Sequence, residues 1–302
     1  MASLTEIHIR DPFVLPVPEE RLYYLFGTTG AGVGFDCYRS ADLDDWEGPI
    51  PAFRPPAGFS ADRDFWAPEV HVLDGVHYMF ASLKSPDRRR GTQVFASARP
   101  EGPYLPHSAG PLTPAEWECL DGTLFVDAAG RPHLVFCHEW VQVGDGEICA
   151  LALRPDLRGP AGPPRLLFRA SAAAWVHRPA PDGGSPRLVT DGPFLYRGRD
   201  GALGMLWSSF SVRGYAVGLA MSVSGALDGP WSQRTTPVYD AGGGHAMRFR
   251  DFAGRDWLAL HAPNGGGAER ARLLPVRETA AGLDLGAAPE AGAAGGPPHP
   301  RA

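Results

Sequence analysis

Short runs of apolar and aromatic residues recur along the chain, and each run follows a short polar anchor or one that contains Gly or Pro. The runs are rich in aromatic and branched side chains and alternate imperfectly between apolar and polar positions, which is typical of β-strands. Long amphipathic patterns with a helical period are hard to find. The strand-like runs are Leu22–Phe26, His77–Ser82, His133–Phe136, Leu203–Ser209 and Asp256–His261.

The anchors divide the chain into five units of roughly fifty residues, which is enough for about four strands each. The anchors are Arg10-Asp11-Pro12, Ala67-Pro68-Glu69, Asp121-Gly122-Thr123, Asp191-Gly192-Pro193 and Gly243-Gly244-His245. Five such units predict an all-β fold of five radially arranged sheets, a five-bladed β-propeller. Because the first strand of each blade lines the central channel, anchor residues far apart in the sequence would meet at one end of it.

The C-terminal segment differs in composition from the rest of the chain. From residue 280 to residue 302, 17 of 23 residues are Ala, Gly or Pro, and such a segment has little to bury. We therefore expect a single propeller domain over residues 1–278 and a short disordered tail over residues 279–302.

Composition and charge exclude several classes of protein. The formal net charge is −6, from 28 basic and 34 acidic residues, which argues against binding to a nucleic-acid backbone. No run of about 18 apolar residues is present, so we expect no membrane-spanning helix. The first ten residues show no secretory pattern, so we expect a cytoplasmic protein. The 4 cysteines lack zinc-like spacing and are expected to be reduced thiols in the core.

Three of the anchors carry an aspartate: Asp11, Asp121 and Asp191. At equivalent positions of a repeat, their side chains would converge at the mouth of the channel. Carboxyl groups packed together perturb one another's pKa values, so that one stays protonated while another stays ionised. Glycoside hydrolysis needs that division, with an acid for the leaving oxygen and a base for water. Taken singly, an Asp before Gly or Pro is also a common turn residue.

The order and spacing of these motifs resemble those of glycoside hydrolase family 43, five-bladed propellers that include α-L-arabinofuranosidases, β-xylosidases and arabinanases. The resemblance implies that Asp11 is the general base that activates water. It implies that Asp121 tunes the pKa and orientation of the general acid, which would lie at the start of the fourth unit. It also implies inversion by direct displacement, with base and acid about 6.5–9.5 Å apart. The matching segments are Arg10–Phe13, Trp66–Val70, Asp121–Asp127, Asp191–Tyr196 and Gly244-His245.

The fourth anchor departs from the family pattern. That family usually has Glu before Gly-Pro, whereas this chain has Asp191. The shorter side chain reaches roughly 1 Å less far, and misplacement on that scale can cost on the order of 10²-fold in rate. Three interpretations stay open. The loop is repositioned so that Asp191 is the acid, or another carboxyl such as Glu139 takes the role, or the site binds sugar without turnover.

Further residues are expected to bind the substrate. Sugars need flat apolar faces and hydrogen-bonding groups, and the candidates are Phe35, Trp66, Glu139 and His245. Trp66 is favoured for stacking on a sugar ring. The resemblance implies that His245 lies in the central channel, where a His of that family contacts a calcium ion or its waters. Because calcium prefers oxygen ligands, such a contact would run through water. No metal site is firmly indicated and no cofactor is required, with calcium left open.

The pattern and the resemblance together predict an inverting glycoside hydrolase that removes terminal arabinofuranosyl or xylosyl residues from short oligosaccharides. No nucleic-acid or membrane partner is expected. The alternative is a propeller with an impaired site that binds carbohydrate or a partner protein without turnover. A retaining, fructosidase-type propeller is a further alternative, and it would need a nucleophile and an acid about 5–5.5 Å apart.

Overall fold

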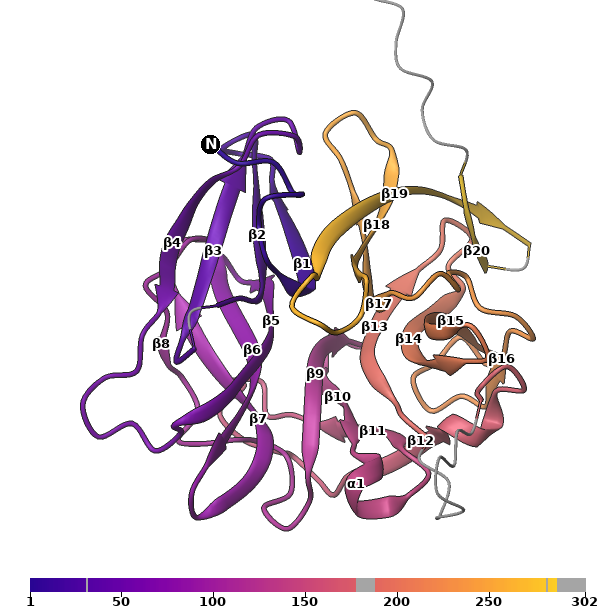
Figure 1. The fold of residues 1–302 in the computed structure, drawn as a ribbon. Coiled ribbons are helices and arrows are strands. Elements are labelled where there is room, and N and C mark those ends of the chain that lie inside the picture. The colour runs from indigo at the N-terminus through magenta and orange to yellow at the C-terminus, as the bar shows by residue number, and fades with distance from the viewer. Residues whose placement is uncertain (31, 178–187, 281, 287–302) are drawn as a thin grey trace, which may run out of the picture.

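Five antiparallel sheets of four strands surround a central channel in the computed structural model of the chain (Figure 1). The structure describes all residues except 31, 178–187, 281 and 287–302. Within each sheet the strands follow one another in chain order from the channel outwards. The predicted five-bladed β-propeller is confirmed.

Strands at the same place in each blade form four concentric sets. The innermost strands are β1 (Arg10–Val17), β5 (Arg63–Leu73), β9 (Cys119–Val126), β13 (Asp191–Arg197) and β17 (Gly244–Arg250). The second strands are β2 (Leu22–Thr28), β6 (Val76–Ser85), β10 (Pro132–His138), β14 (Leu203–Ser211) and β18 (Asp256–Ala262). The third strands are β3 (Phe35–Ser40), β7 (Arg88–Ser97), β11 (Glu147–Ala152), β15 (Gly214–Ser222) and β19 (Arg270–Thr279). The outermost strands are β4 (Glu47–Phe53), β8 (Leu105–Pro106), β12 (Arg165–Arg169), β16 (Trp231–Gln233) and β20 (Gly282–Leu285).

Helical structure in the described part of the chain is confined to two short segments, α1 (Trp140–Val143) and the 3₁₀ turn η1 (Ala170–Ala172). Neither is long enough to cross a membrane. Both lie in loops of blade 3, at the end of the blades where the anchors begin their strands.

The five strand-like runs of the sequence are the second strands of the five blades. Their imperfect alternation has a physical cause: neighbouring blades pack face to face, so a second strand is buried on both sides. β10 is buried along its whole length. Between blades 3 and 4, the rings of Phe168 and Trp207 lie 5.5 Å apart. All four cysteines are buried free thiols, as predicted.

The ring closes where blade 1 meets blade 5, through contacts between strands rather than through a shared strand. The backbone N–H of Ile9 donates to the carbonyl of Glu269 at 3.2 Å. The guanidinium of Arg10 donates to the carboxylate of the same Glu269 at 3.0 Å. The first and last blades are each built from consecutive strands, so these non-covalent contacts join the two ends of the propeller.

The predicted domain boundary at residue 278 is too early. β20 pairs with β19 as the fourth strand of blade 5, although it lies inside the segment predicted as a tail. Leu283 is fully buried, and it supplies the apolar side chain that fixes this strand against the blade. The rest of the predicted tail, from residue 287 onwards, lies outside the described residues.

Candidate active site

At its anchor, each innermost strand has one residue in the left-handed backbone conformation, with φ between 45° and 56°, and β5 has a second such residue, Asp64, near its start. The register between the first two strands of all five blades shifts at the anchor, as it does at a β-bulge. Only one of the five is glycine, and non-glycine residues held there store strain that is typical of functional sites. The five residues are Asp11, Ala67, Asp121, Gly192 and His245.

The structure corrects the phase predicted for the three aspartates. Asp11 and Asp121 occupy the left-handed position themselves, whereas Asp191 stands one residue before it. Gly192 fills the position in blade 4, and a Cβ there would lie 2.8 Å from the ring of His245. Glycine at 192 therefore lets the chain approach the imidazole closely while Asp191 enters the site from the preceding residue.

The left-handed residues tie neighbouring blades together. In four of the five cases, the backbone N–H donates to a side chain on the second strand of the preceding blade. These hydrogen bonds run from Ala67 to Thr28 at 2.8 Å, from Asp121 to Ser82 at 2.8 Å, from His245 to Ser208 at 2.8 Å, and from Asp11 to Nδ1 of His261 at 3.1 Å. The same bonds that join the blades therefore fix the backbone from which the candidate catalytic side chains project.

Asp11 is held as a carboxylate. Its Oδ1 lies 3.2 Å from Nδ1 of His245, and its Oδ2 accepts a hydrogen bond from the hydroxyl of Thr28 at 2.7 Å. Burial disfavours the charged form, but the charge and hydrogen bond of His245, aided by the charge of Arg10, outweigh it and lower the pKa of Asp11. An ionised carboxylate in this position can accept a proton from water.

His245 is the cation at the centre of the site. Nδ1 of its ring lies 3.2 Å from Asp11 and 3.6 Å from Asp121. Burial opposes the charge on the ring, but the two carboxylates raise the pKa of His245 to about 10. A protonated imidazole has no lone pair to offer a metal ion. A contact between His245 and calcium through water stays a prediction.

Asp121 and Asp191 titrate together near neutral pH. Burial raises the pKa of Asp121 to about 6, with the charge of Asp11 adding to it against that of His245. Burial and the charge of Asp121 raise the pKa of Asp191 to about 7. Asp191 accepts a hydrogen bond from the hydroxyl of Tyr215 at 2.9 Å. The centre therefore combines an ionised Asp11 with a carboxyl, Asp191, that still holds a proton near pH 6.

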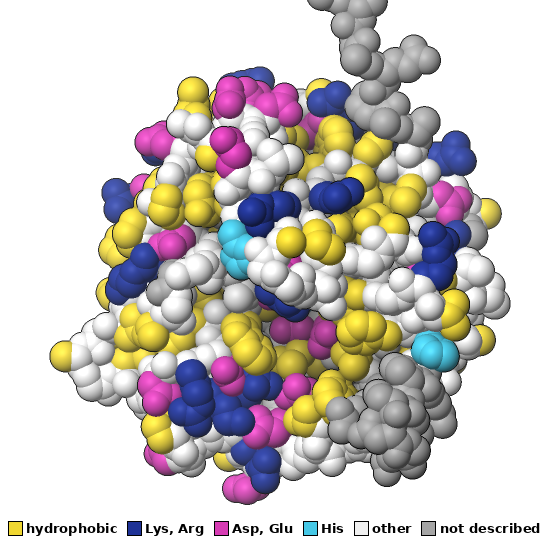
Figure 2. All heavy atoms as spheres, in the orientation of Figure 1, with side chains coloured by type: hydrophobic (Ala, Val, Ile, Leu, Met, Phe, Trp, Pro, Cys, Tyr) yellow, Lys and Arg dark blue, Asp and Glu magenta, His cyan; other side chains and the backbone are white. Residues whose placement is uncertain are grey.

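Aromatic rings and one acidic side chain line the channel below this centre. The rings of Phe13 and Phe194, from the non-adjacent blades 1 and 4, lie 6.4 Å apart, so both project into the channel. Glu69 enters the channel from blade 2 and lies 3.1 Å from the imidazole of His71. Figure 2 shows acidic side chains at the bottom of a hollow near the middle of the molecule. The hollow thus has a charged floor, closed off from the far end of the channel by aromatic rings.

The contacts of three predicted substrate-binding residues lie outside the carboxyl centre. Phe35 is a correction: its side chain is 1% exposed and packs in the core against Phe53 and Phe65, because β3 turns it inward. Trp66 is partly exposed, and the guanidinium of Arg90 lies 4.2 Å above its ring. Glu139 pairs with the same Arg90 at 2.5 Å. The structure therefore places Asp191, and not Glu139, against Asp11, Asp121 and His245.

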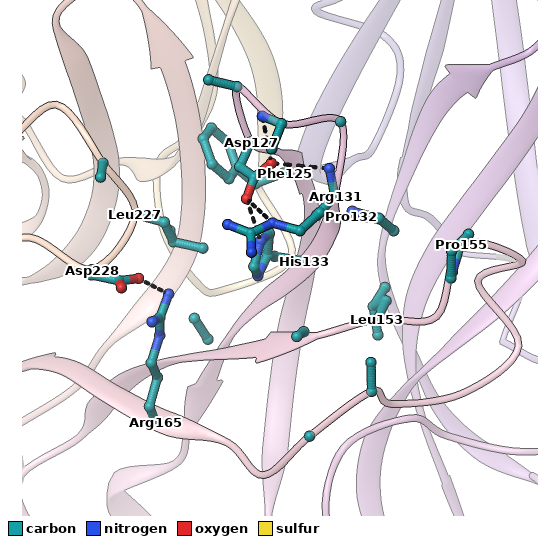
Figure 3. A pocket seen from close by; sticks show the side chains of 18 of the residues that line it. Phe125, Asp127, Arg131, Pro132, His133, Leu153, Pro155, Arg165, Leu227 and Asp228 are labelled. Atoms are coloured by element: carbon teal, nitrogen blue, oxygen red, sulfur yellow. Dashed lines mark hydrogen bonds and ion pairs between the residues drawn. The ribbon is translucent and has the colours of Figure 1, made fainter.

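A separate groove of about 760 Å³ lies between blades 3 and 4 (Figure 3). Its lining includes Asp127, beyond the end of β9, whereas Asp121 is near the start of that strand. Six residues of strand separate the two by about 20 Å. The charges labelled in Figure 3 are paired, since Arg131 donates to Asp127 at 2.8 Å and Arg165 pairs with Asp228. This groove is not where the candidate catalytic groups meet.

The sequence alone did not identify Thr28, Tyr215 and His261 as residues of the site. Nδ1 of His261 accepts the N–H of Asp11, and its Nε2 lies 3.1 Å from Asn264. Burial lowers the pKa of His261, so its ring is neutral and does not form an ion pair with Asp11. A usable signal did exist for two of them: His261 ends the predicted strand-like run Asp256–His261, Thr28 stands two residues after the run Leu22–Phe26, and both pair with anchor residues in the hairpins.

Comparisons with known proteins agree with this geometry. Residues 4–281 match the family described as Glycosyl hydrolases family 43. An endo-arabinase from Bacteroides thetaiotaomicron VPI-5482 is 39% identical with a TM-score of 0.88, over 93% of this chain and 98% of that one. The extracellular exo-α-(1→5)-L-arabinofuranosidase ArbA of Cellvibrio japonicus (strain Ueda107) is 23% identical over 85% of this chain and 79% of its own. An α-L-arabinofuranosidase from Lactobacillus brevis, 18% identical with a TM-score of 0.73 over 92% and 93% of the two chains, shares the fold.

Proposed function

The chain belongs to family 43 of the glycosyl hydrolases, and on that basis we propose that it cleaves arabinofuranosyl linkages by single-displacement inversion. It is a glycoside hydrolase, and its substrate is an oligosaccharide or a polysaccharide. Terminal arabinofuranosyl residues of short oligosaccharides are the proposed target, with terminal xylosyl residues as the second candidate. Support for arabinose comes from the names of two similar proteins, an endo-arabinase and an exo-arabinofuranosidase.

The observation that carries this proposal is the opposite protonation of two aspartates at one centre. Asp11 has a pKa well below its usual range, whereas Asp191 has a pKa of about 7. Near pH 6, one is a base and the other an acid. The separation arises because Asp11 faces the imidazolium of His245, whereas Asp191 is buried beside the charge of Asp121.

The proposed reaction assigns one step to each carboxyl group. Asp11 removes a proton from a water molecule as the water oxygen forms a bond to the anomeric carbon. Asp191 gives its proton to the glycosidic oxygen as the bond from that oxygen to the anomeric carbon breaks. The charge on Asp121 keeps the pKa of Asp191 high enough for that proton to be present. Because water enters opposite the leaving group, the product has the inverted configuration.

Trp66 and the location of the protein stay predictions. The ring of Trp66 is covered on one side by Arg90, which would leave the other side for a sugar. The cytoplasmic location was proposed from the N-terminal residues, and one similar protein is named as extracellular. Nothing in the reaction proposed above requires calcium.

The test is hydrolysis of aryl α-L-arabinofuranosides, aryl β-D-xylosides and arabino-oligosaccharides, with the anomer of the first product read by NMR. We expect turnover of an arabinofuranosyl substrate with inversion. The Asp11→Asn variant should lose at least about 10²-fold in kcat. Asp36→Asn is the matched control, because Asp36 is equally buried but pairs with Arg54 outside the centre.

Two outcomes would contradict the proposal. Binding of arabino-oligosaccharides in a calorimeter without hydrolysis of any substrate would favour a propeller that binds sugar without turnover. A product with retained configuration would favour a covalent mechanism with a nucleophile.

A further inference from the structure

The hydrogen bonds between blades follow one pattern four times and break it once. In each blade, the residue before the left-handed position pairs with a residue of the second strand. In four blades, the side chain of that second-strand residue accepts the N–H of the left-handed residue of the next blade. The five second-strand residues are Thr28, Ser82, Cys137, Ser208 and His261. Cys137 is the exception, because the N–H that should reach it, that of Gly192, donates to Asp121 Oδ2 at 2.9 Å instead.

The chemistry of the thiol accounts for the exception. Sulfur is a weak hydrogen-bond acceptor compared with a hydroxyl or imidazole group. Cys137 is fully buried. Burial, together with the charges of Asp121 and Asp191, raises the pKa of its thiol, so the thiol stays neutral. A serine hydroxyl at 137 would stand where Thr28, Ser82 and Ser208 stand in their own blades, as a strong acceptor for the Gly192 N–H.

The N–H of Gly192 acts on a charge that matters for the reaction. It donates to Asp121, and a hydrogen bond to the charged form of a carboxyl favours that form. Across the pair, the hydroxyl of Tyr215 favours the charge on Asp191 in the same way. When Asp121 and Asp191 hold one proton between them, these two opposing donors decide which carboxyl keeps it.

We propose that Cys137 and the Gly192 N–H are positioning groups: the thiol leaves the N–H free for Asp121, and that hydrogen bond keeps the shared proton on Asp191. This inference rests on the proposed function, in which Asp191 is the acid. It explains why four of the five second-strand residues carry a hydroxyl or an imidazole, whereas the one that faces blade 4, the blade of Asp191, carries a thiol.

Other groups around Asp121 are unchanged by a substitution at 137. They come from every blade that faces the centre, and they set the background against which a new hydroxyl acts. The charged and titratable groups are Asp11, Glu69, Asp191, Tyr215 and His245.

The test compares Cys137→Ser with Cys137→Ala. Ser adds an acceptor for the Gly192 N–H, and Ala removes the sulfur without adding one. A charge-assisted hydrogen bond is strong enough to reverse a difference of about one pKa unit, so kcat of the Ser variant should fall about threefold near pH 6.5. The loss should fade towards pH 5, where both carboxyls are protonated. Cys137→Ala should keep the profile of the unaltered protein.

Cys149→Ser is the matched control, since Cys149 is another buried thiol of blade 3 and the charges nearest to it are those of Glu147 and Arg169. It should leave both kcat and the pH profile unchanged. Equal profiles for Cys137→Ser and Cys137→Ala, or a loss of the same size at every pH, would overturn the inference.

A second readout does not depend on glycosidase activity. In ¹⁵N-labelled protein, the amide proton of Gly192 should shift as Asp121 ionises between pH 5 and 7. The shift should persist in Cys137→Ala and largely vanish in Cys137→Ser. A silent enzyme with this NMR behaviour would contradict the proposed function alone, whereas a Gly192 amide that titrates equally in all variants would contradict this inference.

Discussion

Two clusters of carboxyl groups lie at the same end of the blades, and only one of them has the charge balance of a catalytic centre. In the peripheral cluster, Asp64, Glu118 and Glu139 face three cations. Arg90 reaches Asp64 at 2.8 Å and Glu139 at 2.5 Å, while Glu118 lies 2.9 Å from Lys84 and 3.5 Å from Arg89. All three carboxylates are ion-paired with fixed positive charges, although burial still raises the pKa of Glu139.

The central cluster has more carboxyls than cations. Asp11, Asp121 and Asp191 share one imidazolium, that of His245. Asp11 and Asp121 approach this ring within 4 Å, whereas burial and the charge of Asp121 raise the pKa of Asp191. The comparison shows that an acidic residue near a site is a poor guide by itself. The informative property is the number of cations available to each carboxyl.

The largest expected effect shows which of the two clusters supplies the general acid. Asp191→Asn should lower kcat by about 10²-fold or more for substrates with a poor leaving group, and by less for an activated aryl leaving group that needs no proton. Glu139→Gln should change kcat by less than about threefold, since Arg90 holds this carboxylate in an ion pair. A large loss in Glu139→Gln with an active Asp191→Asn would move the acid to the peripheral cluster.

The next largest effect on kcat is expected from a substitution of Gly192. Gly192→Ala should lower kcat about tenfold, because a Cβ would lie 2.8 Å from the ring of His245 and push it from the carboxylates. Gly201→Ala is the control for backbone strain alone: Gly201 also has a positive φ, and its Cβ would meet nothing within 4 Å. Equal kinetic losses in both variants would assign the effect to strain and not to the displaced imidazole.

A pH profile sharpens the comparison further. The charge of Asp121 disfavours ionisation of Asp191, so Asp121→Asn should lower the pKa of Asp191. The proposed reaction needs the proton on Asp191, whose pKa is about 7, so we expect the alkaline limb of kcat to move about one unit to lower pH. Asp64→Asn, which removes a charge from the peripheral cluster, should leave that limb in place. A limb that stays fixed in Asp121→Asn would break the link between the two carboxyls.

The smallest expected effect belongs to the peripheral cluster. Arg90→Lys keeps the charge but loses the planar group that covers Trp66 and reaches both Asp64 and Glu139. We expect KM to rise about threefold with kcat unchanged, because Arg90 would position the ring of Trp66 that stacks on the sugar. Arg89→Lys should change neither, since Arg89 is half exposed and makes one long contact to Glu118. A fall in kcat without a change in KM would place Arg90 in the chemistry instead.

The sequence was sufficient to predict the five blades. Of the three central aspartates, the repeat pattern predicted the position correctly for Asp11 and Asp121 but not for Asp191. Buried second strands such as β10 are recognisable because their apolar content is dense, and anchor spacing then gives the number of blades. The one-residue offset of Asp191 was not predictable, because it depends on which residue adopts a positive φ, and both Asp and Gly can. Phe35 was misassigned because an aromatic residue near an anchor points to the core or to the channel according to a strand register that composition does not reveal.

The contacts that close the ring make activity depend on the folding of the whole chain as well as on the three aspartates. Asp11 belongs to the first strand of the chain, and its backbone is bonded to His261, 250 residues away in the last blade. In the proposed reaction, the general base is therefore assembled only when the two ends of the chain have come together. A truncated chain that retained all three aspartates but lacked blade 5 would carry an incomplete catalytic centre. Turnover would therefore show that the chain has been synthesised as far as blade 5 and has folded. On heating, we expect activity to be lost when the contacts between blades 1 and 5 break, before the individual blades lose their strands.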